Sequence, residues 1–230
     1  RPGVRGTLRT MCNLYEQPPE IELTKYLEVQ GRLFDLEPYA AGVVAPRRKG
    51  VFLRPGKAAG ELLGRVGQWG MIRPGSPRPK PGDRPHSTNN ARVESITEKV
   101  TFRGAWNAGH RCLVPASWYA EPNWETGANI WWHLRRSDGA PWFLAGLWSE
   151  WLDKATGEVL PNYTVLTVNC NAHALLNRLH RPECDPDTKA PLPIGGNDCW
   201  LRPPTRAVMP MPARMAQRNV SPTSCGSWWR

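Results

Sequence analysis

Apolar residues concentrate in the middle of the chain, in four short runs that are separated by turn-forming residues. The runs are rich in β-branched and aromatic residues and cover residues 112–119, 129–136, 141–148 and 162–170. Ser137-Asp138-Gly139 and Thr156-Gly157 stand between consecutive runs. Short apolar runs bounded by such residues are typical of β-strands. We therefore predict that residues 111–169 are mostly β-structure.

Three segments on either side of these runs have features of helices. Residues 19–33 contain helix-forming residues but only a weak apolar stripe. Ser95 followed by Glu98 fits a capping box and predicts a short helix through about Phe102. Asn171 is a suitable N-cap for a helix with three leucines on one face, Leu175, Leu176 and Leu179. Central strands with surrounding helices predict an α+β fold, with a largely antiparallel, curved or barrel-like sheet and peripheral helices.

The length of the chain suits one domain. It has 230 residues, of which 40% are apolar, as in a globular protein with a sizeable core. The expected divisions are an upstream extension over residues 1–10 that is absent from the mature protein, a domain over 11–205, and a loosely ordered basic tail over 206–230. Pro74 to Pro85 contains five prolines, which predicts a loop or an extended segment.

Basic residues outnumber acidic residues by 30 to 20, which gives a net charge of +10. Such a surplus favours a polyanionic partner, nucleic acid first and anionic membrane second, although a merely basic protein has the same composition. The chain also has 12 tryptophans, which suit a core or base stacking. No apolar run approaches the roughly 18 residues of a membrane span, and residues 1–10 lack the apolar stretch of a signal peptide. We expect a cytoplasmic protein that does not enter a membrane.

The six cysteines do not form a recognisable metal or disulfide framework. None of them makes a C-x-x-C pair, and the spacing of His180 and Cys184 is a weak metal signal. We therefore expect no metal and no cofactor.

Four weak segments follow one another along the chain and together are quite specific. They are Met11 to Tyr15 (MCNLY), Asn90 to Glu94 (NARVE), Arg111 to Ala116 (RCLVPA) with Glu121 six residues after Pro115, and Thr167 to His180. Gln68 to Ile72 (QWGMI) and Phe143 to Trp148 (FLAGLW) also fit. In this order they resemble the SOS-response-associated peptidase (SRAP) domain family, over about residues 11–200.

The resemblance implies a set of functional residues. Cys12, after the initiator methionine, corresponds to the catalytic cysteine, and Glu121, His180 and Asn90 join it in the catalytic site. The DNA-binding residues implied are Asn90, Arg92, Trp69 and Thr167. The partner implied is single-stranded DNA that contains an abasic site, bound by a monomer associated with the nucleoid. The chain departs from the common family start because Asn13-Leu14 replaces Gly-Arg, and extra residues follow His180-Arg181-Pro182.

An N-terminal cysteine can form a ring with the aldehyde of an abasic sugar. Its amine attacks the aldehyde to give an imine, and its thiol then closes a five-membered thiazolidine ring on the same carbon. The α-amine suits this reaction at neutral pH because its reference pKa is about 7.7–8.0, against about 10.4 for lysine. An internal cysteine cannot react in this way, so the chemistry requires that Cys12 become the first residue.

Other interpretations stay open. The chain also fits a thiol peptidase, or autopeptidase, that uses Cys12 and His180, and a basic nucleic-acid-binding module without chemistry. Cys12 as a small buried side chain, Glu121 as a surface carboxylate and His180 as a helix C-terminal residue are the structural alternatives for the three proposed catalytic groups.

Overall fold

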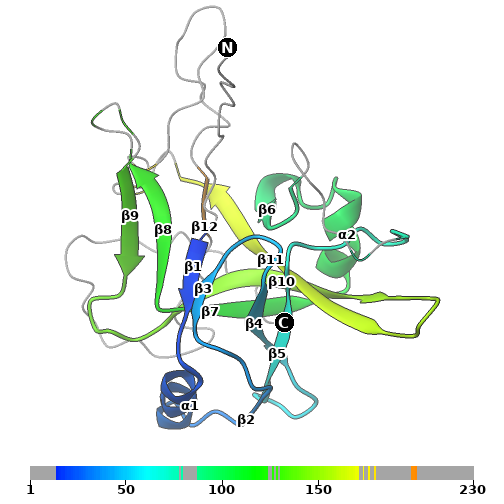
Figure 1. Ribbon diagram of the computed structural model, residues 1–230, viewed down its shortest axis with the longest axis horizontal. Coiled ribbons are helices and arrows are strands. Elements are labelled where there is room, and N and C mark those ends of the chain that lie inside the picture. Colours follow the sequence, from blue (N-terminus) through cyan, green and yellow to red (C-terminus); the bar gives the residue numbers. More distant parts are fainter. Residues whose placement is uncertain are drawn as a thin grey trace, which may run out of the picture.

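The computed structural model describes residues 14–77, 79, 87–123, 126, 128, 130–170, 173, 176, 179 and 198–200. Five strands of this part of the chain close into a barrel (Figure 1). In hydrogen-bonded order they are β11 (Val159–Asn169), β10 (Trp142–Leu152), β7 (Arg111–Ala116), β4 (Lys49–Pro55) and β5 (Leu62–Trp69), and β5 pairs back with β11. The pairs along this order are antiparallel and the closing pair is parallel. The predicted α+β fold with a largely antiparallel, barrel-like sheet is confirmed.

Three further short strands pair with two of the barrel strands, β11 and β5. β6 (Asn90–Arg92) runs parallel to β11, and β12 (Asp198–Trp200) runs antiparallel to it. β2 (Phe34–Leu36) runs parallel to β5. Residue Thr167 of β11 is therefore paired with both β6 and β12.

A second sheet of four antiparallel strands grows directly from the barrel. Its order is β3 (Gly42–Val44), β1 (Leu14–Gln17), β8 (Trp118–Asn123) and β9 (Ile130–Arg135). Only Ser117 separates β7 from β8, and its backbone N–H donates to the Glu16 carbonyl of β1 over 2.7 Å. The chain thus passes from one sheet to the other without a loop.

The barrel strands carry apolar residues on both faces. One face lines the interior, and helices cover the other. Alternate residues point to opposite faces of a strand, so Cys112 and Val114 of β7 enter the central cluster, while Leu113 packs outward with Leu23 and Leu27 of α1 (Glu20–Val29). On another side, α2 (Val100–Asn107) covers a cluster that includes residues of β10 and β11, Ala145, Leu147 and Leu166. This double burial explains the nearly continuous apolar runs of the middle strands.

The helix predicted from Ser95 is wrong. The chain forms a 3-10 turn over Val93–Ser95, and α2 begins only at Val100 because Lys99 is extended, with φ −88° and ψ 117°. The 3-10 turn is tied to the barrel, since the Glu94 carboxylate accepts a 2.8 Å hydrogen bond from the Asn169 backbone N–H of β11. Tertiary contacts of Glu94 therefore outweigh the local capping signal.

Strands from residues 34–69 were not predicted, whereas all four runs of residues 112–170 form strands as expected. The predicted helix N-cap Asn171 lies outside the described residues. None of the helices in the described ranges is long and apolar enough to cross a membrane.

Candidate functional site

Several residues singled out in the sequence meet at one end of the barrel, around Trp200. The Trp200 ring lies 5.1 Å from that of Tyr119 on β8 and 6.2 Å from that of Tyr15 on β1, between ring centroids. Its indole Nε1 donates a 3.0 Å hydrogen bond to Oδ1 of Asn90 on β6. The short strand β12 thus links the second sheet to the segment that carries Asn90 and Arg92.

Glu121 is fully buried at this end. Residues on β8 alternate between two faces, so Glu121 shares its face with the buried side chains of Tyr119 and Asn123. Leu14, the first residue of β1, is paired with Ala120, the neighbour of Glu121. The carboxylate therefore lies beside the start of β1. A carboxylate in this position has the chemistry to transfer protons.

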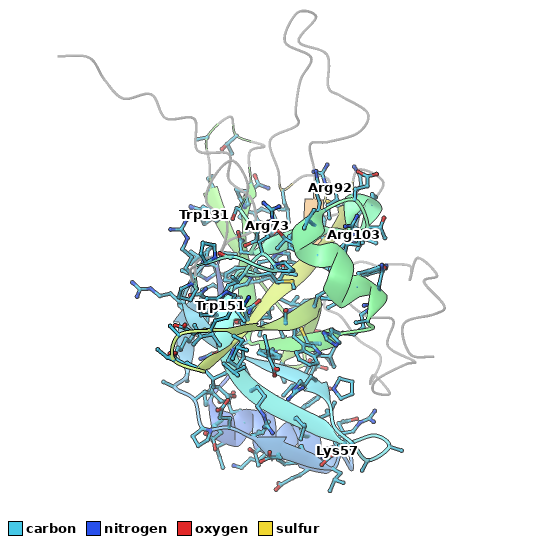
Figure 2. All side chains as sticks on the ribbon, turned by 90° about the vertical axis from the view of Figure 1, so that its right-hand side faces the viewer. Lys57, Arg73, Arg92, Arg103, Trp131 and Trp151 are labelled. Atoms are coloured by element: carbon cyan, nitrogen blue, oxygen red, sulfur yellow. The ribbon has the colours of Figure 1, made fainter. Side chains whose placement is uncertain are left out.

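Asn90 has its amide orientation fixed by Trp200. An indole N–H only donates, so it must face the amide oxygen, and the amide NH₂ then points to the opposite side. Asn90 and Arg92 both lie on β6, in parallel register with Val165 and Thr167. The site residue Arg92 is half-buried, and Figure 2 shows it toward the same end of the molecule as Arg73 and Arg103.

Thr167 is 1% exposed, and its hydroxyl makes no hydrogen bond within the described part of the chain. It sits between Arg92 of β6 and Trp200 of β12, each a register partner. Thr167 is thus placed next to Arg92 and two residues along β11 from Val165, the partner of Asn90. Its hydroxyl is a small donor and acceptor.

The DNA-binding role expected of Trp69 does not fit its position. Trp69 is fully buried and packs edge-on against Tyr15 and Trp200, with ring centroids 5.2 and 5.8 Å away. Its Nε1 donates a 2.8 Å hydrogen bond to the carbonyl of Asn89. No ring face is left for a base, so Trp69 supports the backbone next to Asn90 instead of contacting DNA through its ring.

Cys12 and His180 lie outside the described residues, so their roles stay predictions. Cys112 and Cys170, in the described part of the chain, are both buried. Burial raises the pKa of the Cys112 thiol far above its usual range, which makes this group a poor nucleophile. Among the described residues, no group of three or more His, Cys, Asp or Glu side chains is placed to hold a metal ion.

Trp200 is a site residue that the sequence did not single out. It stands near a proline-rich stretch, and no local pattern links it to Asn90, which is 110 residues away. The pairing of β12 with β11 creates this contact, and such long-range pairing leaves no local signal.

A model of the SOS response associated peptidase (SRAP) family matches residues 16–218. The chain belongs to this family. Among curated proteins, it is 28% identical over 129 residues to the abasic site processing protein HMCES of Xenopus tropicalis. It is 29% identical over 119 residues to the abasic site processing protein YoaM of Bacillus subtilis (strain 168). These matches cover 44% and 51% of this SRAP chain and 36% and 49% of the relatives, so they span less than half the length of either relative.

Solved structures share the SRAP fold of this chain. A crystal structure of a protein from Bordetella bronchiseptica has a TM-score of 0.66 and 28% identity and covers 86% of both chains. A protein from Bacteroides thetaiotaomicron has a TM-score of 0.54 and 23% identity over 69% of this chain and 68% of its own, which is a likeness of fold alone.

Proposed function

We propose that this SRAP protein processes abasic sites in DNA by binding a single strand and bonding covalently to the lesion through Cys12. Both relatives named above are abasic site processing proteins. The observation that carries the proposal is the register of β1 and β8, which places the buried Glu121 beside the start of β1. Cys12 precedes Leu14 by two residues, and two residues of chain reach at most about 7 Å.

The residues have distinct chemical roles in this reaction. The α-amine of Cys12 attacks the sugar aldehyde and loses water to form an imine, and the thiol adds to the imine carbon to close the thiazolidine. Glu121 delivers and removes protons as the sugar ring opens, and His180 moves a proton during imine formation. Asn90 donates from its amide NH₂ to a sugar or phosphate oxygen, and Arg92 neutralises a phosphate.

Single-stranded DNA suits this site better than a duplex. Glu121 is fully buried, so an abasic sugar must turn out of a double helix to approach it. The sugar has no base to unpair, but a duplex holds it between stacked flanking pairs and opposite a complementary strand, whereas a single strand is already open.

The test compares a chain that starts at Met11 with the 230-residue chain that starts at Arg1. Both are mixed with an abasic single strand and resolved by denaturing gel electrophoresis, and their N-termini are read by mass spectrometry. We expect the shorter chain to begin at Cys12 and to crosslink, and the longer one to crosslink only as far as it is trimmed. Cys12→Ala abolishes the stable adduct and leaves at most a transient imine.

Two results contradict this mechanism. The first is an untrimmed 230-residue chain that crosslinks as fast as the shorter chain, because its Cys12 nitrogen is an amide. The second is a Cys12→Ala protein with an equally stable adduct. If both chains bind DNA and neither forms an adduct, only the non-covalent part of the proposal stands.

A further inference from the structure

The edge strand β9 carries two neighbouring tryptophans that are exposed. Trp131 is 42% and Trp132 is 36% exposed, whereas most other tryptophans of the barrel and the second sheet are buried or half-buried. β9 pairs only with β8 among the described strands, and five of its six residues are exposed. Two adjacent large rings on an edge strand call for an explanation beyond packing.

The register of the β8–β9 hairpin distinguishes the two rings. Trp132 is the Cα partner of Glu121, and Trp131 is the partner of Pro122. Residues that face each other across an antiparallel pair share a face of the sheet. Trp132 is therefore on the face of Glu121, and Trp131 is on the opposite face with His133, which stacks on Trp118 with ring centroids 4.0 Å apart.

Trp132 forms the exposed rim of the site that Glu121 occupies. Tyr119 and Glu121 on the same face are buried at 5% and 0%, and Trp132 is the exposed ring beside them. Figure 2 shows Trp131, the neighbour of Trp132 on β9, toward the same end of the molecule as Arg73 and Arg92. An aromatic ring near a cationic surface is the arrangement with which proteins bind single-stranded nucleic acids.

We propose that the indole of Trp132 stacks on the unpaired base next to the abasic nucleotide in a bound single strand. The inference rests on the proposed function, which brings the lesion to Glu121. The nucleotide next to the lesion then lies close to Trp132. Because the lesion has no base, one face of that neighbouring base has no stacking partner. The ring of Trp132 supplies the replacement, so it holds the strand in register with the buried carboxylate.

The experiment measures binding without crosslinking. The probe is a fluorescent single strand with a tetrahydrofuran residue, which lacks the aldehyde and cannot react. Trp132→Leu weakens binding about five- to twentyfold, the lower part of the range for one base stacked on an aromatic ring. Trp132→Phe retains most of the affinity because it keeps a flat ring. Trp131→Leu removes a similarly exposed indole from the opposite face and leaves the affinity near that of the unaltered protein.

A second set of strands identifies the base. A further tetrahydrofuran replaces the nucleotide on the 5′ or on the 3′ side of the lesion. On one of these strands the unaltered protein and Trp132→Leu bind equally, because the base that Trp132 contacts is gone. An equal ratio on all three strands, or an equal loss with Trp131→Leu, overturns the stacking.

The crosslinking assay separates this inference from the proposed function. If the unaltered protein crosslinks abasic DNA and Trp132→Leu binds the tetrahydrofuran strand equally well, the stacking is wrong and the function stands. If the unaltered protein neither crosslinks nor binds, both are wrong.

Discussion

Polar groups of the candidate site take their positions from aromatic neighbours. The indole of Trp200 fixes the amide of Asn90, and the indole of Trp69 holds the Asn89 carbonyl one residue earlier. Both rings pack edge-on against each other and against Tyr15. Indole rings suit this task because each fills space in the core and still donates one hydrogen bond to a polar neighbour.

Glu121→Gln tests the proton-transfer role. Glutamine has nearly the same shape but cannot exchange a proton, so we expect the crosslinking rate to fall by about 10²–10⁴. Binding of a tetrahydrofuran strand changes little, because the side chain keeps its volume in a fully buried place. Single-turnover time courses on denaturing gels give the rate. Glu150→Gln is the control, since Glu150 is an exposed carboxylate that lies 3.9 Å from Arg54. A wild-type rate for Glu121→Gln removes Glu121 from the mechanism.

Two of the residues that the sequence singled out lie together in the fold, whereas a third is fully buried. The NAR segment led to Asn90 and Arg92, which β6 pairs with Val165 and Thr167 of β11. Trp69 was misjudged because an indole beside a glycine looks the same in a core and on a DNA surface. Its burial follows from the pairing of Tyr163 with Trp69 across β11 and β5, which are far apart in the chain.

At the level of elements, predictability depends on how continuous the apolar pattern is. The strands β7, β9, β10 and β11 arise from long apolar or aromatic runs, and these were predicted. β4 and β5 are interrupted by glycines and by charged residues such as Arg54 and Arg65, which read as breaks in a strand. At Gly50, Gly64 and Gly67 a Cβ atom would lie less than 3 Å from a neighbouring side chain, so the feature that hides these strands in the sequence is part of their packing.

Gly50 of β4 illustrates this packing and provides a stability test. A Cβ atom at Gly50 collides with the hydroxyls of Tyr15 and Tyr163, which hydrogen bond to each other in the core. Gly50→Ala therefore destabilises the fold by about 1–3 kcal/mol through overpacking. Gly104→Ala is the matched control, because a Cβ there meets nothing within 4 Å and alanine stabilises a helix by about 0.5–1 kcal/mol relative to glycine. Urea unfolding measures both. Equal midpoints for Gly50→Ala and the unaltered protein contradict the packing.

At the scale of the whole molecule, cationic side chains lie toward both ends of the protein. Figure 2 shows Arg73, Arg92 and Arg103 toward one end and Lys57 at the other. Arg73, Arg103 and Lys57 are exposed, and Arg92 is half-buried on β6 beside the candidate site. A strand that follows the proposed path past Glu121 and Asn90 therefore meets the arginine end and leaves the Lys57 end free.

This asymmetry predicts which charges determine the salt dependence of DNA binding. Each phosphate neutralised on a single strand contributes about −0.7 to the slope of log affinity against log salt, so roughly three to five contacts give a slope of about −2 to −3.5. Arg92→Ala weakens binding of damaged and undamaged strands alike and flattens the slope by about 0.7, because one released counterion is lost. Lys57→Ala removes the same charge from the opposite end and leaves the slope unchanged. Fluorescence anisotropy with tetrahydrofuran and intact strands at four salt concentrations measures all three proteins. A flat dependence for the unaltered protein, or an equal change for Lys57→Ala, contradicts a DNA path along the arginine end.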